Sequence, residues 1–76
     1  MFGRIIDARG MRCPLPIIES AKAIRGMADS ESFILQSDDP ATHNDLIAWA
    51  RMTGHRIEAL GNDEFLIVAV KPAANN

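Results

Sequence analysis

The chain has 76 residues, 47% of them apolar, and a formal net charge of −2. This length allows one small domain, which buries roughly 60% of its unfolded surface and has no room for a large enclosed cavity. The acidic balance argues against binding to nucleic acid or to an anionic membrane. No apolar run reaches the roughly 20 residues that span a bilayer, and Asp7 interrupts the start of the chain before a signal peptide can form. We therefore expect a cytoplasmic protein, with no membrane contact and no direct binding to nucleic acid.

The first half of the chain predicts a strand, a loop, a helix and a second strand. A short β-branched run at 4–8 indicates the first strand, and a loop at 9–12 follows it. A helix is predicted from Pro14 to Arg25, with Gly26 placed to end it. Its apolar positions recur at helical spacing: Ile17, Ile18, Ala21, Ile24 and Ala28. Residues 33–37 indicate the second strand.

The second half predicts a helix and a hairpin. Asp39 is the expected N-cap, with Pro40 at the first helical position, and the helix runs to Thr53. Strands are predicted at 56–60 and 65–70, joined by a tight turn at 61–63. The last strand is apolar on both of its faces, so it is expected either to lie in the middle of the sheet or to leave surface for a partner chain.

The element order is therefore βαβαββ. Two strand-helix-strand units of the usual right hand place both helices on one face of the sheet. The predicted fold is an α/β two-layer sandwich, in which a four-stranded mixed sheet carries two helices on one face. We expect a single domain over residues 1–76, ordered over about residues 4–71.

Cys13 is the only cysteine of the chain, so no internal disulfide can form. With only two histidines beside it, the chain has too few soft ligands for a structural zinc site, and no metal or cofactor is expected. Cys13 stands at the start of the first predicted helix, where the helix dipole favours a thiolate and lowers the pKa. Pro14 and Pro16 fit the first turn and fix the backbone, but they lack amide protons. We therefore expect the pKa of Cys13 to be lowered only moderately, by the helix dipole and the Leu15 N–H.

The chain resembles the TusA/SirA-like family of small sulfur carriers. The resemblance rests on the run DARGMRCPLP at residues 7–16, which contains the Cys-Pro-x-Pro motif, and on DDPA at residues 38–41. Asp45 and His55 also fall at family-like positions. The similarity extends from about Ile5 to Val70.

The resemblance implies a role for each matching residue. Cys13 would accept a sulfane sulfur as a persulfide, from a cysteine desulfurase or a rhodanese-like donor, and relay it to a downstream acceptor protein. Such a protein is a carrier rather than a self-contained enzyme, and its routes include tRNA thiolation, sulfur oxidation and molybdenum-cofactor enzymes. The implied site residues fall into two groups: structural supports at Gly10, Pro14 and Pro16, and candidate partner contacts at Arg12, Leu15 and Lys22. Leu15 stands where the family member of the thiouridine pathway has an acidic residue. This difference bears on the choice of partner protein.

Two alternatives stay open from the residues alone. In the first, the domain is an interaction or regulatory module that never carries sulfur, so that a charge on the first helix matters and Cys13 does not. In the second, Cys13 is a redox sensor, which would have to form intermolecular disulfides because no resolving cysteine is present. Asp38 and Asp39 suggest a pair of carboxylates for acid-base work, but capping the second helix explains them more simply.

Overall fold

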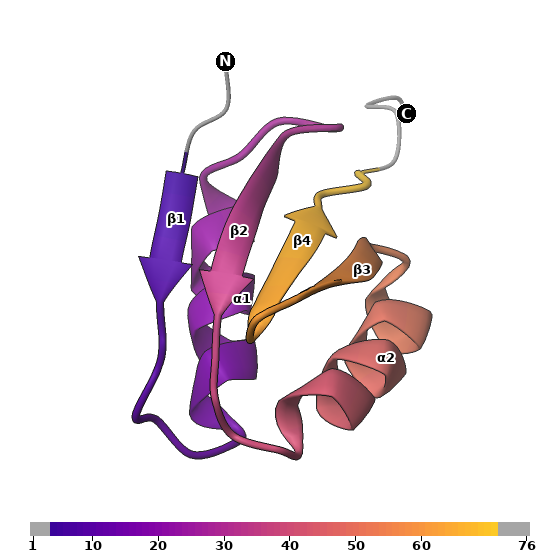
Figure 1. Ribbon diagram of the computed structural model, residues 1–76. Coiled ribbons are helices and arrows are strands. Elements are labelled where there is room, and N and C mark those ends of the chain that lie inside the picture. The colour runs from indigo at the N-terminus through magenta and orange to yellow at the C-terminus, as the bar shows by residue number, and fades with distance from the viewer. Residues whose placement is uncertain (1–3, 72–76) are drawn as a thin grey trace.

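The computed structural model describes residues 4–71 and has the predicted element order. Figure 1 shows the strands β1 (Arg4–Asp7), β2 (Ser32–Gln36), β3 (Arg56–Gly61) and β4 (Glu64–Val68), with the helices α1 (Leu15–Arg25) and α2 (Thr42–Thr53). The strand bounds agree with prediction to within two residues. The prediction about order at the ends of the chain concerns residues 1–3 and 72–76, which lie outside the described residues.

The sheet is mixed and has the strand order β1-β2-β4-β3. β1 and β2 are parallel, and β4 runs antiparallel to both β2 and β3. The carboxyl ends of β1 and β2 therefore meet at one edge of the sheet, as parallel strands require. The β3–β4 hairpin turns through Asn62 and Asp63, which both have positive φ angles, and this confirms the predicted tight turn.

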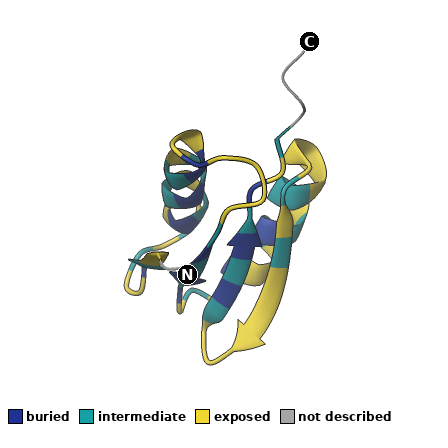
Figure 2. Ribbon diagram, turned by 90° about the horizontal axis from the view of Figure 1, so that it is seen from above, coloured by how far each residue is buried: buried dark blue, intermediate teal, exposed yellow. Residues whose placement is uncertain are grey.

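One face of the sheet is covered and forms the core. Alternate residues of β2 and β4 are buried against the helices, including Phe33, Leu35 and Ile67, and Leu46 of α2 is buried with them. Figure 2 shows this alternation as stripes of buried and half-buried residues along the two strands. On the opposite face, Leu66 and Val68 of β4 are half-buried. β4 lies between β2 and β3, so the expectation of a central strand with two apolar faces is confirmed.

The buried face of α1 differs in part from the predicted one. Ile24 is buried and Ile17 packs against the core, as predicted, but Ile18 and Ala28 are exposed, and Pro16 and Ser20 are buried in their place. Ser20 can be buried because its hydroxyl donates to the Pro16 carbonyl at 3.0 Å, which satisfies the polar group within the helix. The row that faces the core therefore runs at four-residue spacing from Pro16.

The start of α2 was also predicted wrongly. The helix begins at Thr42 rather than at Pro40, and its N-cap residue Ala41 makes no side-chain cap. Asp39 instead forms a turn ahead of the helix, in which its Oδ1 accepts from the Ala41 N–H at 2.8 Å. The helix ends at Thr53, as predicted, and Gly54 follows it in the left-handed conformation, with φ of 86°.

A core substitution tests the two-layer packing. Leu35 is fully buried, so Leu35→Ala removes contacts on all sides and is expected to lower the free energy of unfolding by about 2–5 kcal/mol. Ile5 lies 63% exposed on the open face, and Ile5→Ala is the matched control, with an expected change within about 0.5 kcal/mol. Urea unfolding followed by circular dichroism measures both. Equal losses for the two variants would contradict the assignment of the covered face.

Candidate functional site

The loop between β1 and α1 carries Cys13 and is tied back to the sheet. The Ala8 N–H donates to the Gln36 carbonyl at 2.7 Å, which extends the parallel pairing one residue beyond β1. Gly10 turns the chain with φ of 85°, a conformation that side chains other than glycine rarely adopt. Its N–H donates to Asp38 Oδ1 at 2.9 Å. Gly10 therefore shapes the loop that carries Cys13.

Asp39 connects the cysteine to the start of α2. Its Oδ2 accepts from the Cys13 N–H at 3.0 Å, while its Oδ1 accepts from the Ala41 N–H. The two hydrogen bonds stabilise the charged carboxylate and lower its pKa, with the Ala41 bond the larger cause. Both aspartates of the DDPA run thus hold the cysteine loop, a role that capping alone did not predict. The sequence did indicate this role indirectly, because the predicted strand-helix-strand unit makes β1 and β2 parallel. The loops that follow two parallel strands lie at the same edge of the sheet.

The sulfur of Cys13 lies against buried hydroxyl groups. Cys13 is half-buried, and its Sγ is 3.4 Å from Thr42 Oγ1. Thr42 Oγ1 in turn lies 2.7 Å from Ser37 Oγ, and both of these residues are buried. Thr42 and Ser37 are site residues that the sequence reasoning missed, because Thr42 contacts Cys13 only when α2 packs beside the loop, and Ser37 is connected to the sulfur only through Thr42.

The predicted lowering of the Cys13 pKa is wrong. Burial raises the pKa of the thiol above its ordinary value, and the carboxylates of Asp45 and Asp39 raise it further. The Thr42 hydroxyl acts in the opposite direction but does not outweigh them. The Leu15 N–H, expected to stabilise a thiolate, donates to the Arg12 carbonyl at 2.9 Å instead.

The other predicted site residues divide into those near the sulfur and those away from it. Arg12, Pro14 and Leu15 are exposed beside Cys13, whereas Pro16 is buried beneath the first turn of α1. Arg12 also lines a shallow depression with the Asp38-Asp39 turn. Lys22 lies on the outer face of α1, where its Nζ is 3.6 Å from Glu19 Oε2. The structure thus groups the Cys-Pro-x-Pro run with Arg12 and leaves Lys22 apart.

The histidines pack away from the cysteine. The His43 ring lies 5.7 Å from that of Phe65, and the His55 ring lies 5.3 Å from that of Trp49, measured between centroids. Within residues 4–71, no three side chains of His, Cys, Asp or Glu are grouped in a way that could hold a metal ion. Neither helix of that part of the chain is long and apolar enough to cross a membrane.

Substitution of Asp39 tests the link between the two loops. Asp39→Asn keeps one acceptor oxygen but places an NH₂ group opposite the second backbone N–H, so one of the two hydrogen bonds is lost. We expect a lower urea midpoint and faster amide hydrogen exchange at Cys13. Asp38→Asn is the matched control, because the single bond from Gly10 can be kept by the amide oxygen. If the two variants behave alike, the bridging role of Asp39 is wrong.

The pH dependence of Cys13 reactivity tests the raised pKa. Because the thiolate is the nucleophile, alkylation by iodoacetamide is expected to reach half its maximal rate at a pH above that of an unstructured cysteine peptide. Asp45→Asn removes a neighbouring negative charge and should move the profile to lower pH. A wild-type midpoint below that of the peptide would instead support the helix-dipole argument.

Comparisons with known proteins identify the family and the fold of this chain. Residues 4–71 match the family model described as sulfurtransferase TusA. Among solved structures, the crystal structure of the SirA-like protein from Desulfitobacterium hafniense is similar to this chain. It superposes with a TM-score of 0.76 at 28% sequence identity, over 91% of this chain and 100% of that one. The protein therefore belongs to the TusA family of sulfurtransferases, as the family-model match and the similar fold indicate.

Proposed function

We propose that Cys13 is the residue on which this protein carries sulfur, as a persulfide. The observation that supports this most directly is the placement of the sulfur: Sγ is half-buried beside Thr42, in a loop whose backbone is held by two aspartates. The exposed side of the sulfur can meet a reacting group of another protein. A loop fixed in this way keeps the sulfur in one position without any cofactor.

The transfer is an exchange at a sulfur–sulfur bond. The Cys13 thiolate attacks the terminal sulfur of a persulfide on the donor protein, and the new bond forms as the donor S–S bond breaks. The bonding electrons leave with the donor thiolate, and the proton of Cys13 goes to water or to a base of the donor. Delivery of the sulfur is the same kind of exchange: a thiolate of the acceptor protein attacks the terminal sulfur of the Cys13 persulfide, and Cys13 leaves as the thiolate. Neither transfer therefore needs an external oxidant or reductant.

The raised pKa of Cys13 suits a carrier protein whose thiol must stay unreacted until the donor docks. At neutral pH the free protein holds mostly the protonated thiol, because burial and nearby carboxylates disfavour the thiolate. The thiolate is the form that oxidants and stray electrophiles attack, so a protonated sulfur is protected. A donor that presents positive charge near Asp45 and Asp39 would offset this effect and activate the sulfur at the moment of docking.

Proteins are the proposed partners on both sides of the relay. The donor is a cysteine desulfurase or a rhodanese-like protein, and the acceptor is a protein of a sulfur-transfer pathway, of which tRNA thiolation is one candidate. Arg12, Pro14 and Leu15 are exposed and lie next to Cys13 in the chain, so they form the proposed contact surface for both partners. Leu15 is 47% exposed and offers an apolar contact rather than a charge.

Intact mass spectrometry tests the carrier role. Incubation with a cysteine desulfurase, its pyridoxal phosphate and cysteine is expected to add one sulfur atom to the wild type. Cys13→Ser should gain none, because it removes the only thiol of the chain. Lys22→Ala is the matched control: it keeps the cysteine and lies outside the grouped residues, so it should be loaded like the wild type.

Two results would overturn the proposal. One is sulfur addition to Cys13→Ser at the wild-type level. The other is a cellular phenotype that survives Cys13→Ser but is lost in Lys22→Glu, which would favour the interaction module over the carrier.

A further inference from the structure

Two buried hydroxyl groups connect the core to the sulfur of Cys13, and the carrier role proposed above assigns no chemistry to them. Ser37 directly follows β2, and Thr42 is the first residue of α2. Ser37 Oγ and Thr42 Oγ1 are 2.7 Å apart, the usual length of a hydrogen bond between hydroxyl groups. Thr42 Oγ1 in turn lies 3.4 Å from Cys13 Sγ. These atoms therefore form a continuous chain that ends on the half-buried sulfur.

The backbone that carries the two hydroxyl groups is held by hydrogen bonds. The Ser37 N–H donates to the Asp63 carbonyl at 2.9 Å, in the turn between β3 and β4. The Thr42 N–H donates to the Asp39 carbonyl at 3.0 Å, while Asp39 Oδ2 accepts from the Cys13 N–H. Asp39 thus sets the positions of both Thr42 and Cys13, so that the hydroxyl group is preorganised beside the sulfur.

The direction of the hydrogen bonds follows from the burial of the hydroxyl groups. Each hydroxyl has one hydrogen to donate, and a buried hydrogen without an acceptor is unfavourable. Ser37 and Thr42 are 2% and 0% exposed. Within residues 4–71, the hydrogen-bond partner of Ser37 Oγ is Thr42 Oγ1 alone. Ser37 therefore donates to Thr42, which leaves the Thr42 hydroxyl to donate to Cys13 Sγ.

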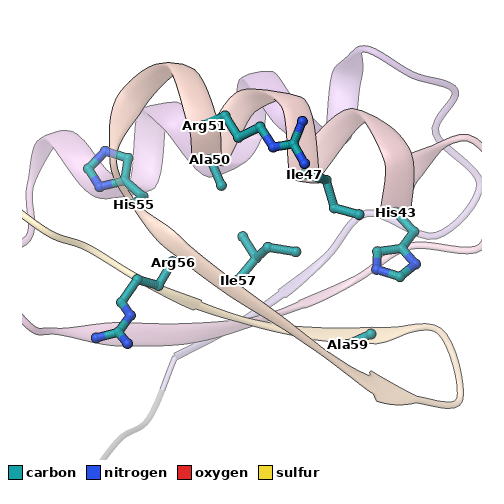
Figure 3. A pocket seen from close by; sticks show the side chains of 8 residues that line it. All are labelled: His43, Ile47, Ala50, Arg51, His55, Arg56, Ile57 and Ala59. Atoms are coloured by element: carbon teal, nitrogen blue, oxygen red, sulfur yellow. The ribbon is translucent and has the colours of Figure 1, made fainter.

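The groove between α2 and β3 gives water no access to these hydroxyl groups. Figure 3 shows the side chains that line it, with His43, next to Thr42 in the chain, at one end. Neither Ser37 nor Thr42 is among the described residues that form its lining. Water in this groove therefore does not replace Thr42 as the acceptor for Ser37.

We propose that Thr42 is a catalytic residue of sulfur delivery, whose hydroxyl stabilises the negative charge that forms on Cys13 Sγ, and that Ser37 orients this hydroxyl. The proposal rests on the carrier role of Cys13. When an acceptor attacks the terminal sulfur of the persulfide, the S–S bond breaks and its electron pair stays on Sγ. A hydrogen bond to a charged acceptor is stronger than one to a neutral acceptor. The bond from Thr42 therefore strengthens as delivery proceeds, which lowers the barrier.

Loading of sulfur depends on Thr42 less than delivery does. The hydrogen bond from Thr42 favours the free thiolate, although burial, the largest cause, raises the pKa of Cys13. A more acidic thiol is ionised more often, but its thiolate is a weaker nucleophile, so the two effects oppose each other during loading. During delivery Cys13 is the leaving group, and a thiolate of lower pKa leaves faster.

Cyanolysis of the loaded protein tests the proposal, because cyanide removes the terminal sulfur as thiocyanate and Cys13 leaves as the thiolate. The protein is loaded by a cysteine desulfurase with cysteine, and thiocyanate is measured against time. Thr42→Val removes the hydroxyl and should release thiocyanate roughly two- to fivefold more slowly than the wild type. Thr42→Ser should restore the wild-type rate, and Ser37→Ala should give an intermediate rate. Thr53→Val is the matched control, because its hydroxyl donates to the Trp49 carbonyl on the same helix, so the rate should not change.

Alkylation of the unloaded protein by iodoacetamide gives a second measurement, which needs no sulfur transfer. The pH at half-maximal rate should rise in Thr42→Val, because loss of the hydrogen bond disfavours the Cys13 thiolate. Thr42→Ser should leave this midpoint unchanged. A purely structural hydroxyl would lower the urea midpoint of Thr42→Val but move neither the alkylation midpoint nor the rate of thiocyanate release.

Two results would overturn the proposal and leave the carrier role intact. One is a wild-type rate of thiocyanate release from Thr42→Val. The other is an alkylation midpoint that does not rise in this variant, which would show that Thr42 does not donate to the sulfur. If Thr42→Val fails to fold, a wild-type rate in Ser37→Ala overturns the proposal instead. If the wild type takes up no sulfur, the carrier role itself fails, and the proposal fails with it.

Discussion

The site depends on one carboxylate that joins two loops. Asp39 accepts hydrogen bonds from the Cys13 N–H and the Ala41 N–H, so the loop after β1 and the loop after β2 are held as one unit. This link is possible because β1 and β2 are parallel and end at the same edge of the sheet. The surroundings of the Cys13 sulfur depend on this link between the two loops. Once the loops are joined, Thr42 lies under Sγ and the carboxylate of Asp45 comes to influence the thiol.

The pKa of the Cys13 thiol is set by opposing effects, of which burial and the neighbouring carboxylates are the stronger. A helix end stabilises an exposed anion by about 0.3–1 kcal/mol. Burial of the sulfur, together with the carboxylates of Asp45 and Asp39, raises the pKa of Cys13 in spite of this effect, and the Leu15 N–H, which is bonded to the Arg12 carbonyl, does not help the thiolate.

The fold was predictable from local patterns because each element carries its own signals. Turn residues separate the six elements, and the apolar residues on both faces of β4 mark it as a strand between two others. The errors arose where tertiary contacts act. Ser20 is not among the predicted apolar positions of α1, yet a hydrogen bond to Pro16 lets it enter the core. Asp39 is the predicted cap of the second helix, yet its second oxygen is held by a residue 26 positions away along the chain.

The sequence by itself determined the element order, the single cysteine, and the rigid Cys-Pro-x-Pro run that presents it. These depend on residue type and on neighbours along the chain, which propensity and steric rules describe. Only the tertiary structure decided the direction of the Cys13 pKa shift, the hydroxyl groups beside its sulfur and the order of the strands in the sheet. Those properties arise between segments distant in sequence, where burial and the distances between charges depend on how the helices pack against the sheet.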